Sequence, residues 1–389
     1  MDVLTLSLVW PFTKMFSQIS AYHGIIFPYE SARSSQNIGV LINTIPDFGT
    51  DLRINPALLN FYKSPQLSIG FHPNWKNYHQ KPNPYNNSKA VSQTNIGDVE
   101  LAGSYPYILS NKKAVLAFSI NSVNSPKFES YEVLEKTRHQ FVSYSRKGNV
   151  FNSSIGIGVE LTERFSLGFS LTKWFGSWNL KNKVILPDSI NWGGEYTYNG
   201  KFFTFGLFYQ LKKISAGFTL QTPFTLMESS QFHIGTWMRD EDHNLSKSFK
   251  GAARWEIAYD FNSRIRFGIG YLYQDNIILQ DNFTSEGVTH SFKRKYGASH
   301  NISLGGQYIL TLKEIKMPVY LTYRLASAPS SETSDFMQYQ NISVKKGANP
   351  FWSVAGGLNL HYNNYQINLA TQLTSQKIYA ITEIAPPYS

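Results

Sequence analysis

The stretch 155–172, IGIGVELTERFSLGFSLT, contains two runs of alternating residues on either side of a polar turn at 162–164. Large apolar residues occupy every second position of both runs, and the positions between them are mostly Gly, Ser and Thr. A period of two is the period of a β-strand, whose successive side chains point to opposite faces. Two such runs joined by a three-residue turn predict an antiparallel β-hairpin.

The same arrangement recurs along the chain at intervals of about fifty residues. The short polar turns lie at 111–113, 162–164, 212–213, 262–264, 312–314 and 363–364. Longer polar connections alternate with them, at 76–94, 125–148, 175–199, 226–249, 275–297 and 327–349. Alternating strands with short turns at one end and long loops at the other are typical of a transmembrane β-barrel, in which the long connections are extracellular.

We count 13 strands, one at about 66–75 and two around each of the six turns. Single-chain bacterial barrels have an even number of strands, so a barrel of about 14 is expected. The closing strand is expected either beyond residue 389 or at 378–385. The predicted fold is therefore all-β, an antiparallel transmembrane barrel formed by residues 64–389.

Composition agrees with this interpretation. Of the 389 residues, 15% are aromatic and only 16% are charged, against about 25% charged in soluble domains. Mean hydropathy is −0.28 and no run of 18 apolar residues occurs, which argues against a membrane-spanning helix. A soluble β-sandwich can show the same alternation. Large aromatic residues on one face, with Tyr and Trp at the strand ends, favour a lipid-facing barrel.

Charge and motifs exclude several function classes. The net charge of +10 comes from Lys and Arg scattered over turns and loops, which favours solvated turns near anionic membrane lipid over nucleic-acid binding. The chain has no cysteine, so disulfides, thiol catalysis and Cys-type zinc sites are excluded. No nucleophile elbow, zinc-protease motif or P-loop is present, and no cofactor or metal is expected. The sequence therefore predicts a protein that is not an enzyme.

Residues 1–63 do not show strand alternation. Residues 3–12 could be the core of an atypical export signal, because the run is apolar but lacks a basic residue before it. Asn55 is a good helix N-cap, and Pro56 suits the first helical position, where no backbone N–H is needed. A short helix at 57–62 is expected to lead into the first strand.

Several motifs in order resemble the FadL-type family of outer-membrane transporters. Asn55-Pro56-Ala57 resembles the NPA motif of that family's hatch, the plug inside the barrel, and it follows Ala32-Arg33 and Asp47/Asp51. The segments 206–211 and 216–218 resemble the family's sixth and seventh strands. The resemblance implies a bacterial outer-membrane protein, monomeric, that takes up long-chain fatty acids or other hydrophobic compounds by diffusion. Its expected partners are a fatty-acid-like ligand and membrane lipid.

The alternative function is a structural or partner-binding component of a secretion or surface-assembly system. A general porin for polar solutes is disfavoured, because a plugged lumen passes little. For the transporter, an apolar site that captures ligand is expected among the long connections. Its candidates are the loop aromatics Trp174, Phe175, Trp178, Trp192, Phe232 and Trp237. The competing interpretation is that these residues form an interfacial girdle or pack the loops.

Alternation places Arg266 and Arg324 on the lumen face of their strands, together with Glu160, Glu256 and Asp260. An Arg can hold a carboxylate through two parallel hydrogen bonds, so Arg266 or Arg324 could bind a ligand headgroup. The competing interpretation is that these arginines pair with the inward acids and stiffen the barrel.

Overall fold

The computed structural model describes residues 41, 44, 51–78, 91–109, 111–123, 128–135, 140–185, 190–234, 241–285, 288–312, 315–327, 331–334, 342–344, 351–362, 365–375 and 382–384. Within these residues two short helices precede the strands, α3 (Asp51–Ile54) and the 3-10 helix η1 (Pro56–Phe61). No helix of this part of the chain is long and apolar enough to cross a membrane.

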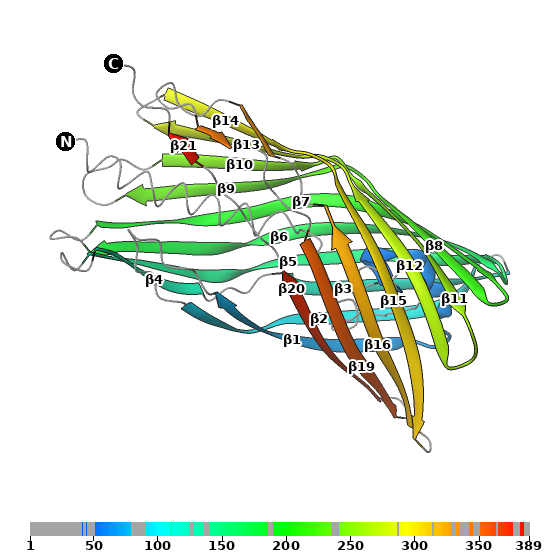
Figure 1. Ribbon diagram of the computed structural model, residues 1–389. Coiled ribbons are helices and arrows are strands. Elements are labelled where there is room, and N and C mark those ends of the chain that lie inside the picture. Colours follow the sequence, from blue (N-terminus) through cyan, green and yellow to red (C-terminus); the bar gives the residue numbers. More distant parts are fainter. Residues whose placement is uncertain are drawn as a thin grey trace.

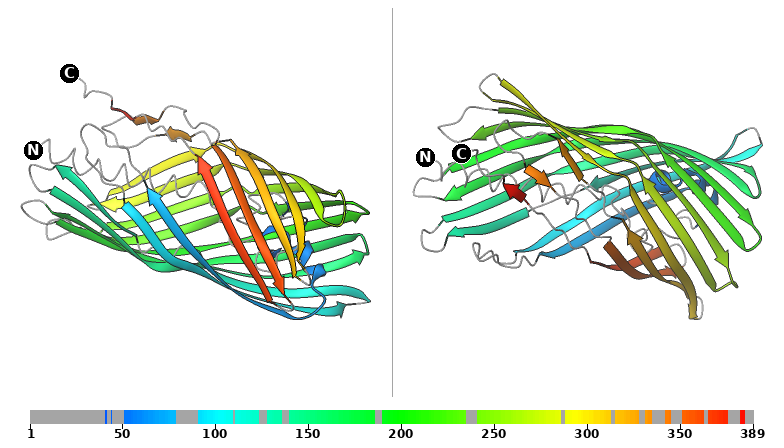
Figure 2. Two further views of the ribbon diagram at one scale, coloured as in Figure 1. Left: turned by 60° about the horizontal axis from the view of Figure 1, so that its bottom comes forward. Right: turned by 45° about the horizontal axis from the view of Figure 1, so that its top comes forward.

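The strands form one large antiparallel sheet that curves into a barrel (Figures 1 and 2). Their bounds are β1 (Gln66–Tyr78), β2 (Val91–Leu109), β3 (Lys112–Val123), β4 (Phe128–Glu135), β5 (Gln140–Thr162), β6 (Phe165–Ile185), β7 (Ile190–Leu211), β8 (Ile214–Gln221), β9 (Phe224–Ile234), β10 (Glu241–Phe249), β11 (Ala252–Asp260), β12 (Ile265–Gln274), β13 (Ile277–Ser285), β14 (Val288–Tyr296), β15 (Ser299–Leu312), β16 (Ile315–Ala326), β17 (Ser331–Ser334), β18 (Ile342–Val344), β19 (Phe351–Tyr362), β20 (Tyr365–Ser375) and β21 (Thr382–Ile384).

The predicted set of thirteen wall strands is confirmed. Antiparallel registers link β1–β2–β3–β5–β6–β7–β8–β11–β12–β15–β16–β19–β20 in that order. The six predicted polar turns join neighbouring strands of this set. Because neighbours are antiparallel and the number is odd, β1 and β20 run in the same direction.

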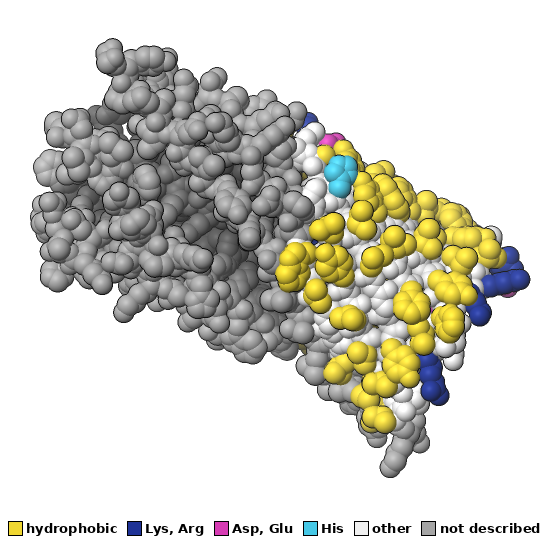
Figure 3. All heavy atoms as spheres, in the orientation of Figure 1, with side chains coloured by type: hydrophobic (Ala, Val, Ile, Leu, Met, Phe, Trp, Pro, Cys, Tyr) yellow, Lys and Arg dark blue, Asp and Glu magenta, His cyan; other side chains and the backbone are white. Residues whose placement is uncertain are grey.

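Burial in the wall is the inverse of burial in a soluble sandwich. Apart from Ala216 and Ala253, the residues that β8 and β11 present to the outside are large and apolar, and those on their inner face are small or polar. Ile155 is 60% exposed and Leu321 is 66% exposed, while Ser170 and Thr204 are fully buried. On the face drawn in Figure 3, hydrophobic side chains are spread over the described surface, and most of the visible Lys and Arg side chains lie at the short-turn end. Soluble monomers rarely expose an apolar surface of this extent, so the wall requires surrounding lipid.

Much of what the sequence predicted as loops is sheet. On the loop side, β9, β10, β13 and β14 pair with one another and continue the wall beyond β8, β11, β12 and β15. We call β8, β11, β12 and β15 the lower tier and β9, β10, β13 and β14 the upper tier. Short non-strand segments separate the two tiers along the chain, and one of them contains Gly251, whose φ is +121°. Above the apolar band both faces of a strand can be polar, so the backbone ladder continues while the alternation disappears. Figure 1 shows the sheet bending where the two tiers meet.

Residues 382–384, the described part of the chain end, do not form the predicted closing strand. β21, which falls within the expected segment 378–385, pairs with β18 in a separate two-stranded sheet. The prediction that this segment completes the barrel is therefore wrong for residues 382–384. A three-residue strand is too short to span a bilayer, which takes about nine to eleven residues.

Candidate functional site

Residues 51–62 contain a capped turn, and we use the name hatch for this segment of α3 and η1. Asn55 is extended (φ −148°, ψ 93°), and its side-chain oxygen accepts the Ala57 N–H at 3.1 Å. Pro56 occupies the first position of η1, where a missing N–H costs nothing. The predicted cap and short helix are confirmed, except that the turn is a 3-10 helix ending at Phe61.

The hatch turn lies directly against a strip of glycines on the inner wall. Gly158, Gly168 and Gly206, here called the glycine strip, are paired in register across β5, β6 and β7. A Cβ at Gly168 would lie 2.1 Å from the Pro56 carbonyl carbon, and one at Gly206 would lie 2.1 Å from Asn55 Oδ1. Only glycine allows the hatch backbone to approach the strands this closely.

Hydrogen bonds fix the hatch to the same three strands. Asn55 Nδ2 donates to the Leu207 carbonyl at 3.1 Å. Arg53 Nη1 donates to Asn152 Oδ1 at 2.6 Å, and Ser170 Oγ donates to the Leu52 carbonyl. The hatch is therefore held by shape and by hydrogen bonds along β5–β7.

The chain before α3 contacts the opposite side of the barrel. Leu41 packs against Ala258 of β11 and Tyr320 of β16, and Thr44 Oγ1 donates to the buried Glu256 carboxylate. Leu41 and Thr44 thus lie against β11 and β16, whereas residues 51–62 contact β5–β7. Figure 2 shows α3 and η1 inside the curved sheet. Of the N-terminal residues that the structure describes, Leu41, Thr44 and 51–62 therefore contact separate parts of the inner wall.

The inner wall carries an aromatic patch above the hatch. Its members lie on β6, β7, β9 and β10 and are buried except for the half-buried Phe224, and we call the following residues the inner aromatic patch: Trp174, Tyr198, Phe202, Phe224, Leu226 and Phe249. Phe224 stacks on Phe249 at 4.5 Å and contacts Phe202 at 4.8 Å between ring centroids. Pairing of β9 with both β7 and β10 brings these residues together.

Trp174 gives the inner aromatic patch a polar group. Its side chain is 7% exposed, and its indole N–H has no hydrogen-bond partner within the described residues. A buried donor left unsatisfied costs about 1–3 kcal/mol, so a ligand acceptor at this point would be stabilised. The patch therefore combines apolar surface with one available donor, as small-molecule sites commonly do.

A belt of buried charges adjoins the patch, formed by Lys247, Arg254, Glu256 and Arg324. Glu256 and Arg324 lie on one row across the sheet, because Glu256 pairs with Gly270, Gly270 with Ser303, and Ser303 with Arg324. All four charged side chains make interactions within the protein. Burial of ionised groups is costly without such partners, so this belt stiffens the lumen as well as making it polar.

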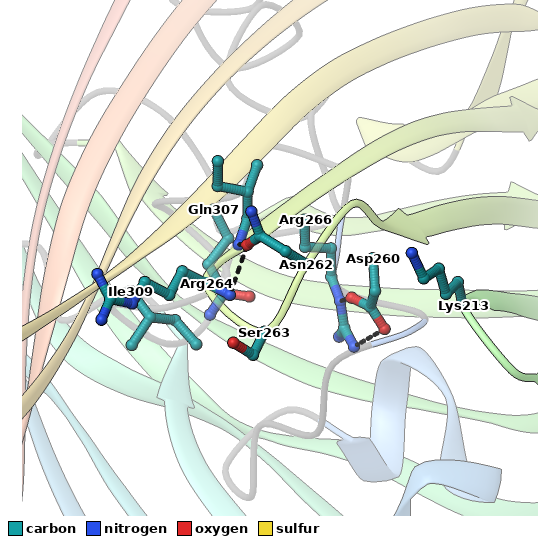
Figure 4. Close-up of a pocket in the computed structure, with 9 residues that line it drawn as sticks. Lys213, Asp260, Asn262, Ser263, Arg264, Arg266, Gln307 and Ile309 are labelled. Atoms are coloured by element: carbon teal, nitrogen blue, oxygen red, sulfur yellow. Dashed lines mark hydrogen bonds and ion pairs between the residues drawn. The ribbon is translucent and has the colours of Figure 1, made fainter.

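The two predicted headgroup arginines do not form one site. Arg324 is 5% exposed in the belt, whereas Arg266 lies four positions nearer the short turns, opposite Gln307. The Arg266 guanidinium makes two hydrogen bonds to Asp260, and both residues line a cavity of about 460 Å³ with Lys213, Arg264 and Gln307 (Figure 4). This ion pair matches the alternative interpretation for Arg266.

The predicted capture residues are distributed differently from the expectation. Trp174, Phe175 and Trp178 lie on β6, Trp192 on β7 and Phe232 on β9, so all five are in strands and not in loops. Trp174 faces the lumen, whereas Phe175 faces outward and stacks on Phe151 at 5.8 Å. Trp237 and the side chains of Trp178, Trp192 and Phe232 lie outside the described residues. The prediction of one loop cluster is wrong for Trp174 and Phe175, because adjacent strand residues face opposite ways.

Sequence reasoning missed Phe202, Phe224 and Phe249. The available signal was the pair Phe202-Phe203, which interrupts the alternation by placing an aromatic ring on each face of β7. An apolar residue on the lumen face of an otherwise polar-lined barrel marks a place where the interior is dry. Phe224 and Phe249 fall where the chain was predicted to leave the wall.

No protein-family model and no curated protein matches the sequence. Solved structures do match. A FadL homologue from Pseudomonas aeruginosa superposes with a TM-score of 0.58 at 10% identity, covering 89% of this chain and 90% of that one. The CymD monoaromatic hydrocarbon channel gives 0.55 at 13% identity, covering 86% and 90%. The toluene transporter TodX of Pseudomonas putida gives 0.51 at 13% identity, covering 88% and 91%.

These matches span nearly the whole of both chains in each case. At such low identity they establish a shared fold, so the chain has the fold of FadL-type channels and the predicted resemblance is confirmed at that level. All three structural relatives are described as channels, transporters or their homologues, and none as an enzyme.

Proposed function

We propose that this protein is an outer-membrane channel that takes up long-chain fatty acids or other hydrophobic compounds past a fixed plug. The observation that carries the proposal is the combination of a lipid-facing barrel, a hatch docked in its lumen and an aromatic patch inside the wall. A pore for polar solutes needs a lumen that is open to water. A route for apolar molecules needs apolar surface along a lumen that is closed to water.

The inner aromatic patch is the proposed ligand-binding surface. Phe202, Phe224 and Phe249 offer ring faces to an acyl chain or an aromatic ring, and Trp174 offers a donor to a polar end. The buried cations Arg254, Lys247 and Arg324 make the adjoining lumen favourable for a carboxylate. Burial of apolar ligand surface contributes about 25 cal/mol per Å², so contact with this patch supplies most of the affinity.

The hatch triplet Asn55-Pro56-Ala57 is proposed to keep the lumen closed to ions while ligand passes. Its tight seating on the glycine strip supports a plug that stays docked at this point. Ligand movement would then involve parts of the lumen other than the strip.

Uptake in cells tests the proposal. A bacterium lacking its own outer-membrane fatty-acid transporter is supplied with this protein, and accumulation of labelled oleate and of a polar dye is measured in the same cultures. We expect oleate uptake to rise while polar-dye entry stays at the background level.

The same uptake measurements distinguish the transporter from the alternative function, a structural or partner-binding scaffold. A scaffold would leave oleate uptake at background although the folded barrel is present in the outer membrane. Stable partner proteins recovered with the barrel after crosslinking would then support a secretion or surface-assembly role. A porin would raise dye entry, contrary to the proposal.

A further inference from the structure

Two lysines face each other on the outside of the barrel. Lys173 of β6 and Lys201 of β7 are directly paired in register. Both side chains are exposed, and the neighbours of each along its strand, Thr172 and Trp174 or Gly200 and Phe202, are buried on the lumen side. Like charges directly opposite on one sheet face destabilise the pairing. A pair in this position is therefore unexpected unless a negative group lies between them.

No carboxylate of the described residues provides that negative group. Within the part of the chain that the structure describes, no ion pair joins Lys173 or Lys201 to a carboxylate. Both ammonium groups are thus available to a ligand approaching from outside the wall.

Hydroxyl groups extend the lysine pair on either side. Ser153 of β5 pairs directly with Lys173 and shares its outward face. On the other side, Thr225 of β9 faces outward, and its Oγ1 lies 3.0 Å from Ser248 Oγ of β10. We call Ser153, Lys173, Lys201 and Thr225 the outer polar stripe. Phosphate oxygens accept hydrogen bonds from ammonium and hydroxyl groups, and this stripe offers two of each.

The outer polar stripe interrupts an otherwise apolar surface. Ile155, Leu171 and Phe203 lie on the short-turn side of the stripe, in register with one another across β5, β6 and β7. Phe175 lies on the loop side of Lys173 and is 37% exposed. An amphiphile with its charged group on the stripe would therefore lay its hydrocarbon chains along this apolar wall.

The height of the stripe matches the outer edge of the membrane. Eight residues separate Phe165, at the start of β6, from Lys173. At about 3.4 Å per residue and a tilt of about 40°, this is a rise of roughly 21 Å, and the longer path down β7 gives somewhat more. The apolar band of such barrels is about 25 Å tall, so the lysines lie where its loop-side edge meets headgroups.

We propose that the outer polar stripe binds a phosphate group of lipid A, the phosphorylated glycolipid of the outer leaflet. This inference rests on the outer-membrane location in the proposed function and not on the ligand carried through the lumen. Charge complementarity selects an anionic headgroup, and the loop-side position selects the leaflet. Lys173 and Lys201 bind the phosphate, Ser153 and Thr225 donate further hydrogen bonds, and the acyl chains contact Leu171 and Phe203.

Binding of defined lipids to the purified full-length barrel in detergent tests this site. Native mass spectrometry would measure bisphosphorylated lipid A, the same lipid with its phosphates removed, and phosphatidylglycerol. The variants are K173Q/K201Q, the charge-retaining K173R/K201R, and K212Q/K213Q. The last pair is a matched control, because it removes two adjacent lysines at the short-turn end. Heat-modifiable gel mobility shows that each variant is folded.

We expect K173Q/K201Q to bind lipid A at least about tenfold more weakly, because two charge-assisted contacts are lost. K173R/K201R and K212Q/K213Q should bind lipid A as the unmodified protein does. Removing the phosphates should weaken binding to the unmodified protein similarly, and phosphatidylglycerol, which carries one phosphate where this lipid A carries two, should bind more weakly than lipid A. Undiminished lipid A binding by folded K173Q/K201Q overturns the inference, and so does equal binding of either other lipid.

A parallel measurement separates this inference from the proposed function. Oleate binding is recorded on the same preparations, and K173Q/K201Q should retain it, because both lysines face away from the lumen. If K173Q/K201Q binds lipid A as the unmodified protein does while oleate binding is present, only the proposed phosphate site is refuted. If the unmodified protein does not bind oleate while K173Q/K201Q still binds lipid A more weakly, only the proposed transport role is refuted.

Discussion

Gly168 is the residue at which one added methyl group would displace the hatch. The nearest atoms to a new Cβ are all backbone, at 2.1–2.5 Å in Pro56 and Ala57, so no side-chain rotation relieves the clash. We predict that G168A folds as a barrel but loosens the plug, at a cost of about 1–3 kcal/mol to hatch docking. Ion conductance in planar bilayers should rise.

G356A is the control for that experiment. The nearest atom to a Cβ at Gly356 is 3.5 Å away, which is an ordinary contact. It should conduct like the unmodified protein. Equal conductance of G168A and G356A would show that the strip does not seat the hatch.

Asn55 combines two roles that substitution can separate. N55A removes both the cap on Ala57 N–H and the hydrogen bond to the Leu207 carbonyl, and the cap alone is worth about 0.5–2 kcal/mol. N55D keeps the acceptor for Ala57 but loses the donor to Leu207. We predict greater protease cleavage near the hatch in the order N55A, N55D, unmodified protein. Indistinguishable cleavage rates would contradict an anchoring role.

Trp174 provides a test of ligand polarity. W174F keeps an aromatic ring on the inner aromatic patch and removes the unpartnered indole N–H. We predict that oleate affinity falls about three- to tenfold, which corresponds to one ordinary hydrogen bond of about 0.7–1.4 kcal/mol. Affinity for toluene, which has no acceptor, should not change. A parallel loss for both ligands would mean that Trp174 acts through shape alone.

At the scale of the elements, we predict that the lower tier of the sheet folds without the tip of the β9–β10 hairpin in the upper tier. β8 pairs directly with β11, with Ala252 opposite Gln221, so the lower wall does not need the hairpin of β9 and β10 to close at this point. Deleting the hairpin tip, residues 231–242, should leave a heat-modifiable folded barrel. Failure of the deletion to fold would show that the upper tier also directs assembly of the wall.

Sequence periodicity predicted the elements that contact lipid and failed for those that do not. The alternation in Phe165–Leu171 follows from one face in hydrocarbon and one in the lumen, and it correctly located β6 and its neighbours. β9, β10, β13 and β14 have no comparable signal, because strand pairing is a backbone property and water can contact both of their faces. The hatch turn was predictable at Asn55 and Pro56, where capping chemistry is local.

The candidate site was less predictable than the fold. Trp174 was identified by residue type, but its separation from Phe175 depends on both being in a strand. The inner aromatic patch joins residues from 174 to 249, and no local pattern links Trp174 with Phe249. The glycine strip likewise appears only when Gly158, Gly168 and Gly206 come into register.

In the whole molecule, the apolar outer surface and the docked hatch serve one purpose, the selective passage of hydrophobic molecules that we propose. The outer surface holds the barrel in lipid, and the hatch stops free diffusion of polar solutes. The inner aromatic patch then provides the contact at which hydrophobic molecules are distinguished from them.

Equilibrium binding of a labelled long-chain fatty acid to the purified, detergent-solubilised barrel tests this claim most directly. The account predicts saturable binding in the micromolar range, about −8 kcal/mol, competed by unlabelled fatty acid and weakened by F202S/F249S within the inner aromatic patch. Absence of saturable binding by protein with the heat-modifiable mobility of a folded barrel would contradict it.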